Sequence, residues 1–182
     1  SWAEAKELLD KALSYPENLG EGRLEGTKDN QLYYYCGCAM EGMGRSEEAA
    51  AFYEKATLGN QEPAGMMYYY DQPADMILYQ GLAFQKLGRV REANSRFYKL
   101  LDYGEEHLRD QVKMDYFAVS LPDFLIFDED LNLKNEAHCY YLMGLARLGL
   151  GQKKKAETDF DEVLRRDCSH QNGILYRKMA KK

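Results

Sequence analysis

The chain has 182 residues, of which 45% are hydrophobic, and a formal net charge of −6 at pH 7. This is enough for one domain or one repeat array with a buried core, but no apolar run approaches the roughly 18 residues of a membrane span. An isoelectric point of about 5.2 argues against nonspecific binding to nucleic acid, which depends on a basic surface. The four cysteines are irregularly placed and give no disulfide framework, which favours the reducing cytoplasm. Taken together, these features lead us to expect a soluble cytoplasmic protein with no membrane or nucleic-acid partner.

The first residues predict one amphipathic helix. Ala5, Leu9 and Ala12 recur at three- and four-residue steps, as on one face of a helix. Pro16 and the glycines that follow it then end the helix. We interpret residues 1–19 as a half repeat, the second helix of a hairpin whose first helix lies further upstream, which makes the chain a fragment of a longer protein.

Three segments further along share one pattern and align without a gap. Each has a glycine, a second glycine seven residues later, an alanine twelve later and an aromatic residue sixteen later. Apolar residues on both sides of the second glycine follow the helical period, which predicts two helices joined by a tight turn. The second glycine suits a left-handed helix end, and the first glycine and the alanine suit close helix approach. The four positions are Gly37, Gly44, Ala49 and Tyr53; Gly81, Gly88, Ala93 and Phe97; and Gly144, Gly151, Ala156 and Phe160.

The predicted hairpins occupy about residues 30–63, 74–107 and 137–168. A short insertion at about residues 64–73 separates the first two and is predicted to be a widened loop. The tail, residues 169–182, carries apolar residues that are expected to cover the last hairpin, which otherwise exposes an apolar edge.

The longer insertion, about residues 109–136, has enough pattern to be folded. Leu108, Val112 and Tyr116 recur at helical spacing, which predicts a helix before Pro122. This proline stops the helix or starts a second, short apolar helix. We therefore expect an extra helical element between the last two hairpins.

An aromatic or aliphatic residue stands four positions before each first glycine, at Tyr33, Ile77 and Tyr140. With it, the pattern resembles the tetratricopeptide repeat (TPR). In that family about 34 residues form a helix hairpin, and hairpins stack into a right-handed superhelix with a concave binding face. The resemblance implies an all-α fold of stacked antiparallel hairpins, a TPR-like α-solenoid with two insertions, and a noncatalytic scaffold for a peptide or partner protein.

In this family the first helix of each hairpin lines the concave groove. Members that grip a C-terminal carboxylate place Lys and Asn at positions that hold Tyr34, Cys38 or a leucine here, and these side chains cannot form charge-assisted hydrogen bonds to a carboxylate. We therefore expect an apolar peptide, or one of the chain's own insertions, in the groove. The implied groove residues are Gln31, Tyr34, Cys38 and Glu41; Asp75, Leu78, Leu82 and Gln85; and His138, Tyr141, Leu145 and Leu148.

A second resemblance concerns the second half of the chain and a short stretch near its start. Residues 116–123, 135–144 and 12–18 are similar to a group of bacterial proteins of unknown function, in which a β-rich domain like sugar-binding or mutarotase-like sandwiches precedes tetratricopeptide repeats. It implies an alternative function, as an accessory or dimerisation region of a larger carbohydrate-related protein. A homodimer is left open.

Zinc-ligating residue types occur as two pairs. The first pair is His138 and Cys139, and the second is Cys168 and His170. Neighbouring residues on a helix point about 100° apart, and Cys139 falls at a core position. We expect packing and not a zinc site.

Calcium is suggested by Asp128, Asp130 and Asn132, which alternate along the chain. A calcium loop needs glycine and glutamate where this chain has Leu133 and Cys139, so an acidic turn that caps the next helix is favoured. The chain also lacks a Gly-x-Ser-x-Gly elbow and a phosphate-binding glycine loop. We expect no metal, no cofactor and no enzymatic activity.

Overall fold

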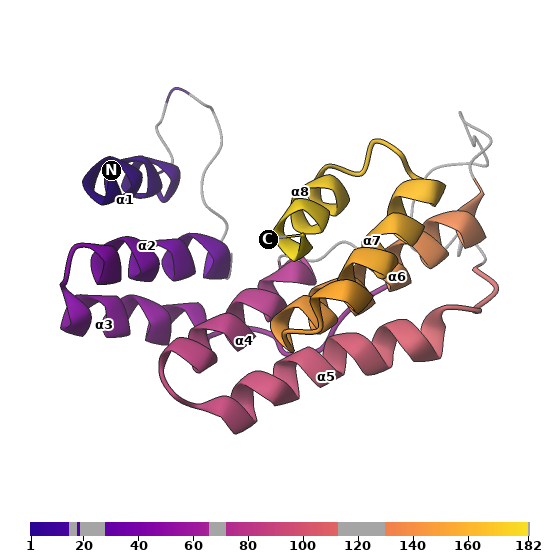
Figure 1. Cartoon of the computed structure of the whole chain (residues 1–182), viewed down its shortest axis with the longest axis horizontal. Helices are drawn as coiled ribbons and strands as arrows, with labels where there is room; N and C mark the ends of the chain where they lie inside the picture. Colours follow the sequence, from indigo (N-terminus) through magenta and orange to yellow (C-terminus); the bar gives the residue numbers. More distant parts are fainter. Residues whose placement is uncertain (15–17, 19–27, 66–71, 113–129, 182) are drawn as a thin grey trace. The chain divides into compact units, whose positions relative to one another are not determined.

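The computed structural model describes residues 1–14, 18, 28–65, 72–112 and 130–181. In these residues every regular element is a helix, which confirms the predicted all-α fold (Figure 1). The right-handed superhelix stays a prediction. The helices are α1 (Trp2–Ala12), α2 (Asn30–Gly42), α3 (Ser46–Ala56), α4 (Asp75–Lys86), α5 (Val90–His107), α6 (Leu131–Gly149), α7 (Lys153–Arg166) and α8 (Gln171–Ala180).

The chain divides into two compact units. The first contains α1 to α4 and α5 as far as Leu100, and the second contains α5 from Leu101 together with α6, α7 and α8. In the first unit α2 packs on α3, α1 packs on α2, and α4 packs on both α2 and α3. In the second unit α6 and α7 form the main hairpin, and α8 packs on both of its helices.

An aromatic ring packs against the first glycine of each repeat. A Cβ atom built on Gly37, Gly81 or Gly144 would lie within 3.0 Å of the ring sixteen residues later. The predicted close approach is therefore confirmed, and the neighbour of each glycine is the aromatic residue of the second helix in the same hairpin. The second glycine of each repeat has a positive φ, between 73° and 76°, which confirms the predicted left-handed helix ends.

The third hairpin starts earlier than the sequence pattern indicates. Asp130 is the N-cap of α6, and its side chain accepts hydrogen bonds from the backbone N–H groups of Asn132 and Leu133. Because a carboxylate at this position satisfies free N–H groups of the first turn, the helix begins at Leu131, before the predicted start of the hairpin at about residue 137.

The prediction of a helix after Leu108 is wrong for residues 108–112, the part of this segment that the structure describes. Helix α5 ends at His107, and residues 108–112 are not helical. Side chains of α6 bond to this segment: Asn135 Nδ2 donates to the His107 carbonyl, and Asn132 Oδ1 accepts from the Val112 N–H. The predicted apolar helix after Pro122 and most of the shorter insertion lie outside the described residues.

Candidate binding site

The predicted groove residues of the first unit lie on α2 and α4. Asp75 and Leu78 are buried, with 8% and 1% of their surface exposed, so they contribute to packing. The others reach the surface to different degrees: Gln31, Tyr34, Cys38 and Leu82 are half-buried, and Glu41 and Gln85 are exposed.

Aromatic and polar contacts hold this surface in one arrangement. The ring of Tyr34 lies 5.4 to 5.9 Å from the rings of Tyr35, Tyr53 and Tyr79. Glu41 Oε2 accepts hydrogen bonds from Lys86 Nζ at 2.6 Å and from the Tyr53 hydroxyl at 2.7 Å. These two bonds lower the pKa of Glu41 and join α2 to α3 and α4.

The predicted groove residues of the second unit lie on α6, where α8 covers part of them. His138 and Leu148 are half-buried, but only 6% of Tyr141 and 0% of Leu145 is exposed. The Tyr141 ring lies 4.9 Å from the His170 ring and 6.1 Å from the Tyr176 ring. Two of the four predicted positions, Tyr141 and Leu145, are therefore buried, and α8 with its N-cap covers Tyr141.

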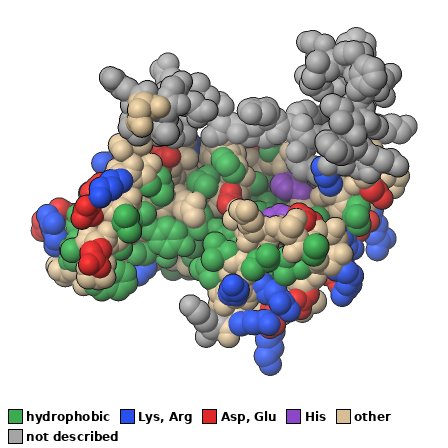
Figure 2. Space-filling view, turned by 90° about the horizontal axis from the view of Figure 1, so that it is seen from above, with side chains coloured by type: hydrophobic (Ala, Val, Ile, Leu, Met, Phe, Trp, Pro, Cys, Tyr) green, Lys and Arg blue, Asp and Glu red, His purple; other side chains and the backbone are tan. Residues whose placement is uncertain are grey.

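A pocket of about 480 Å³ opens beside His138. It lies between one face of the first turns of α6 and the junction of α7 with α8. In the space-filling view, histidine side chains appear on this face of the second unit next to hydrophobic and charged groups (Figure 2). The lining residues are Asp130, Leu133, Lys134, Ala137, His138, Arg166, Asp167 and His170.

Several polar groups of the pocket hold the ends of helices. Asp130 caps α6, and the His170 Nδ1 accepts a hydrogen bond of 2.9 Å from the Gly173 N–H at the start of α8. Asp167 accepts from the backbone N–H and the hydroxyl of Ser169, at 3.0 and 2.8 Å. These bonds lower the pKa of Asp167, so its carboxylate is ionised at neutral pH.

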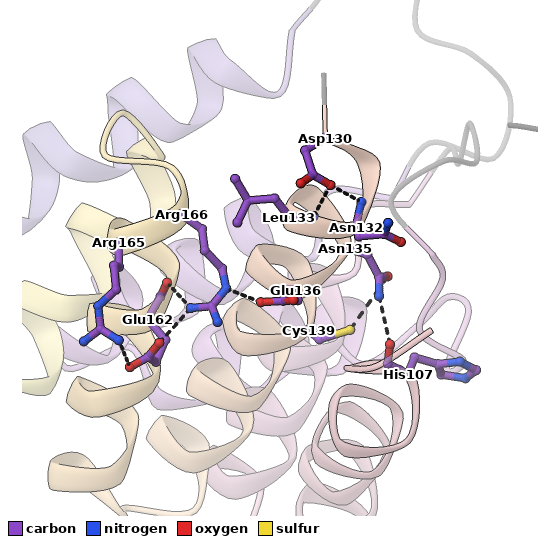
Figure 3. A network of polar contacts seen from close by, with 10 residues as sticks. All are labelled: His107, Asp130, Asn132, Leu133, Asn135, Glu136, Cys139, Glu162, Arg165 and Arg166. Carbon is purple, nitrogen blue, oxygen red and sulfur yellow. Dashed lines mark hydrogen bonds and ion pairs between the residues drawn. The ribbon is translucent and has the colours of Figure 1, made fainter. Parts of the chain in front are cut away.

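Arg166 fixes the wall of the pocket that α7 supplies (Figure 3). Its Nε donates to Glu136 Oε2 at 2.7 Å, and its Nη1 donates to the carbonyl and the carboxylate of Glu162 at 3.0 and 2.7 Å. The guanidinium group also lies 4.4 Å from the centre of the Tyr140 ring. Because a planar guanidinium makes these contacts together, α6 and α7 are held in a defined register beside the pocket.

Of the four residues considered as zinc ligands, the two histidines lie in the pocket and the two cysteines lie outside it. His138 and His170 both line the pocket, whereas Cys139 is fully buried, which raises its pKa to about 11, and Cys168 is exposed. Among the described residues, no group of three His, Cys, Asp or Glu side chains is arranged to hold a metal ion. Sequence reasoning noted both histidines but not that they share a pocket.

A family model described as tetratricopeptide repeat matches residues 137–168. The match begins within α6 and ends just after α7, and so confirms the predicted resemblance at the third hairpin. No solved structure matches the chain, and no helix in the described part is long and apolar enough to cross a membrane. A hairpin repeat of this kind supports a scaffold role in protein–protein interaction. The resemblance to bacterial proteins with a β-rich domain stays a prediction, as do the cytoplasmic location and the homodimer.

Proposed function

We propose that this chain is a noncatalytic module that binds an extended segment of a partner protein. The observation that carries the proposal is the pocket beside His138. His138 is a groove position implied by the repeat pattern, and it lies in the hairpin that matches the family model. A volume of about 480 Å³ falls in the range of ligand sites in proteins, and suits anchoring side chains of a peptide.

The surface of the first unit supports the same proposal. Tyr34 and Leu82 are half-buried, so each presents part of its apolar body to solvent. Tyrosine combines a large apolar surface with a hydrogen-bonding hydroxyl, which makes it common where proteins bind one another. The fixed arrangement of Tyr34 among the neighbouring tyrosines lowers the entropy lost when a partner binds.

The chemistry of the pocket favours binding over catalysis. Its two carboxylates accept hydrogen bonds in helix caps and turns, and one nitrogen of His170 does the same. The Nε and Nη1 of Arg166 are engaged with Glu136 and Glu162. These groups hold the walls of the pocket, a structural task that is compatible with a binding site.

Peptides selected from a random displayed library against the whole chain provide the test. We expect calorimetry to show that His138→Glu weakens binding of the selected peptides about tenfold or more, which corresponds to about 1.4 kcal/mol. Thr158→Glu, on the exposed side of α7 in the same unit, is the matched control and leaves the affinity unchanged. For peptides that bind the first unit, Leu82→Glu and the exposed Val90→Glu form the equivalent pair. Selection of no peptide, or binding that neither groove variant alters, would contradict the proposal.

A further inference from the structure

The side chain that caps α8 is a histidine. His170 is the N-cap residue of this helix, and its Nδ1 accepts a hydrogen bond of 2.9 Å from the Gly173 N–H. Side chains also cap α1 and α6, where the capping residues are Ser1 and Asp130. Of these three residue types, only histidine ordinarily changes its charge between pH 5 and pH 8. Among the side-chain caps of the described helices, the cap of α8 is therefore the one suited to respond to pH in this range.

Only the neutral ring of His170 can make this cap. A ring nitrogen that accepts a hydrogen bond carries no proton, so the proton of the neutral ring lies on Nε2. Protonation of the ring places a second proton on Nδ1, which then cannot accept from Gly173. It also adds a positive charge at a helix N-terminus, which the helix dipole disfavours, and the first turn of α8 has no acidic residue to compensate.

The N–H group that loses its acceptor is packed against α7. Gly173 is buried, and a Cβ atom built on it would lie 3.1 Å from Val163 Cγ1. Gly173 is the third residue of α8, so its N–H has no partner within the helix. Because a buried N–H group without an acceptor is costly, we expect the first turn of α8 to move toward solvent when the cap is lost.

The charged and titratable groups around His170 come from α6 and from the end of α7. The positive charges of His170 and Lys134 both contribute to lowering the pKa of Asp167, so a protonated His170 ring is attracted to this carboxylate. Turning toward Asp167 takes the ring away from Gly173, and the attraction therefore favours loss of the cap. The groups that surround His170 are the carboxyl groups of Asp130 and Asp167, the cations of Lys134 and Arg166, the ring of His138 and the phenol of Tyr141.

We propose that His170 is a pH switch at the start of α8. The neutral ring caps the helix and lies against Tyr141, whereas protonation removes the cap and this ring contact and opens the first turn. The rest of α8 stays docked, because Tyr176 stacks on the Phe160 ring with 6.1 Å between the ring centres. Tyr141 is an implied groove residue, so an effect of the switch on partner binding rests on the proposed function, but the opening of α8 does not.

NMR spectroscopy of the whole chain at pH 8 and pH 5.5, with no peptide present, tests this inference. We expect the protection of the Gly173 amide against hydrogen exchange, relative to an unfolded chain at the same pH, to fall about fivefold or more at pH 5.5. This is the effect of losing a typical N-cap. The nuclear Overhauser contact between the rings of Tyr141 and His170 should be lost at pH 5.5, while that between Tyr176 and Phe160 persists. Unchanged protection of Gly173, or a retained contact between Tyr141 and His170, would overturn the inference.

Three variants assign the response to its source. His170→Asn keeps an oxygen that can cap α8 but does not titrate, so the protection of Gly173 is expected to be the same at both pH values. His138→Asn removes the other histidine of the pocket, and Asp159→Asn removes a buried carboxyl group of the same hairpin. Both should respond like the wild type.

A response that persists in His170→Asn, or that disappears in either of the other variants, would also overturn the inference. Circular dichroism at both pH values checks that each variant is folded. Because peptide binding is not measured, failure of the switch leaves the proposed binding function standing, and failure of peptide selection leaves the switch standing.

Discussion

The α2–α3 and α6–α7 hairpins share the contact between glycine and ring but differ in what fills the space beside it. In the first hairpin the aligned positions hold Met40 and Phe52, which pack as apolar groups. In the second they hold Arg147 and Asp159, which form an ion pair, and Asp159 is only 3% exposed. The shared residues therefore set how two helices meet, and the residues that differ decide how the stability of each hairpin responds to pH.

The largest expected effect comes from the feature that the two hairpins share. Gly144→Ala would place a methyl group within 3.0 Å of the Phe160 ring, and we expect a loss of about 2 kcal/mol in the free energy of unfolding because overpacking displaces the ring. Gly37→Ala is expected to cost a similar amount through Tyr53.

Two spectroscopic probes separate these variants. The single tryptophan, Trp2, lies against Gly42 in the first unit, so its fluorescence follows that unit, whereas circular dichroism follows both. Gly37→Ala should shift both transitions in denaturant, and Gly144→Ala should shift mainly the one seen by circular dichroism. Adding Phe160→Leu to Gly144→Ala should recover part of the loss. Equal shifts of fluorescence by both variants would contradict the assignment.

The next effect concerns the ion pair that only the second hairpin has. Burial raises the pKa of Asp159 from 3.8 to about 6, although the hydrogen bond from Arg147 lowers it. A carboxyl group that holds its proton more tightly in the folded state adds stability at low pH, and this contribution is lost as the pH rises from about 4 to about 6. Asp159→Asn removes the ionisation but keeps a hydrogen-bonding side chain.

Thermal or denaturant unfolding across this pH range measures the effect. The stability of the wild type relative to Asp159→Asn is expected to fall by about 2 kcal/mol between pH 4 and pH 7. The comparison with the variant cancels the contributions of the other carboxylates. A difference that stays constant with pH would show that Asp159 titrates normally in the folded chain.

A smaller effect compares two buried asparagines, one in each unit. Asn30 Nδ2 donates to the carbonyls of Ala56 and Leu58, at 2.8 and 2.6 Å, whereas Asn135 Nδ2 donates to one carbonyl, that of His107. We expect Asn30→Ala to cost about 2 kcal/mol and Asn135→Ala about 1 kcal/mol, because a buried hydrogen bond contributes about 1 kcal/mol and the first variant loses two such bonds to carbonyls while the second loses one. Chemical denaturation measures both, with Asn94→Ala on α5 as the control. Equal losses in the free energy of unfolding for the two variants would contradict the idea that the number of lost hydrogen bonds determines the cost.

The smallest effect is expected at the surface of the first unit. Lys86→Gln removes the ion pair with Glu41, and because both side chains are exposed we expect a change below about 1 kcal/mol that shrinks further in high salt. The pKa of Glu41, followed by NMR titration, should rise toward its ordinary value. A large, salt-independent loss would mean that this pair stabilises the unit more than an exposed pair normally does.

The sequence predicted the hairpins well because their signals are local. Gly44 and its equivalents act through their own backbone conformation, and Gly37 and its equivalents meet a ring at a fixed distance along the chain. The acidic turn expected to cap the next helix is confirmed by the N-cap Asp130, but the start of α6 directly after it was not predicted. The same is true of the end of α5 at His107, which depends on asparagines of a later helix.

The candidate site was harder to predict because it joins residues of α6 to the end of α7 and to the segment between α7 and α8. In the sequence, His138 and His170 stood out only as residue types that can bind metals. The burial of Tyr141 under α8 could not be predicted without knowing where α8 packs. A signal was present in the repeat itself, because the residues that follow a hairpin return to the start of its first helix. Residues about one repeat apart, such as His138 and His170, can therefore line the same pocket.

The ring that rests on a glycine in each hairpin has a consequence for how such chains diverge. The ring touches main-chain atoms, which every residue type possesses, and so the contact places few demands on the side chains around it. Most positions of the motif can therefore change in sequence while the glycine and the aromatic residue are retained. The replacement of Met40 and Phe52 by Arg147 and Asp159 at the aligned positions is an example. Distant copies of this motif are therefore better sought by a glycine and an aromatic residue sixteen positions apart than by overall identity.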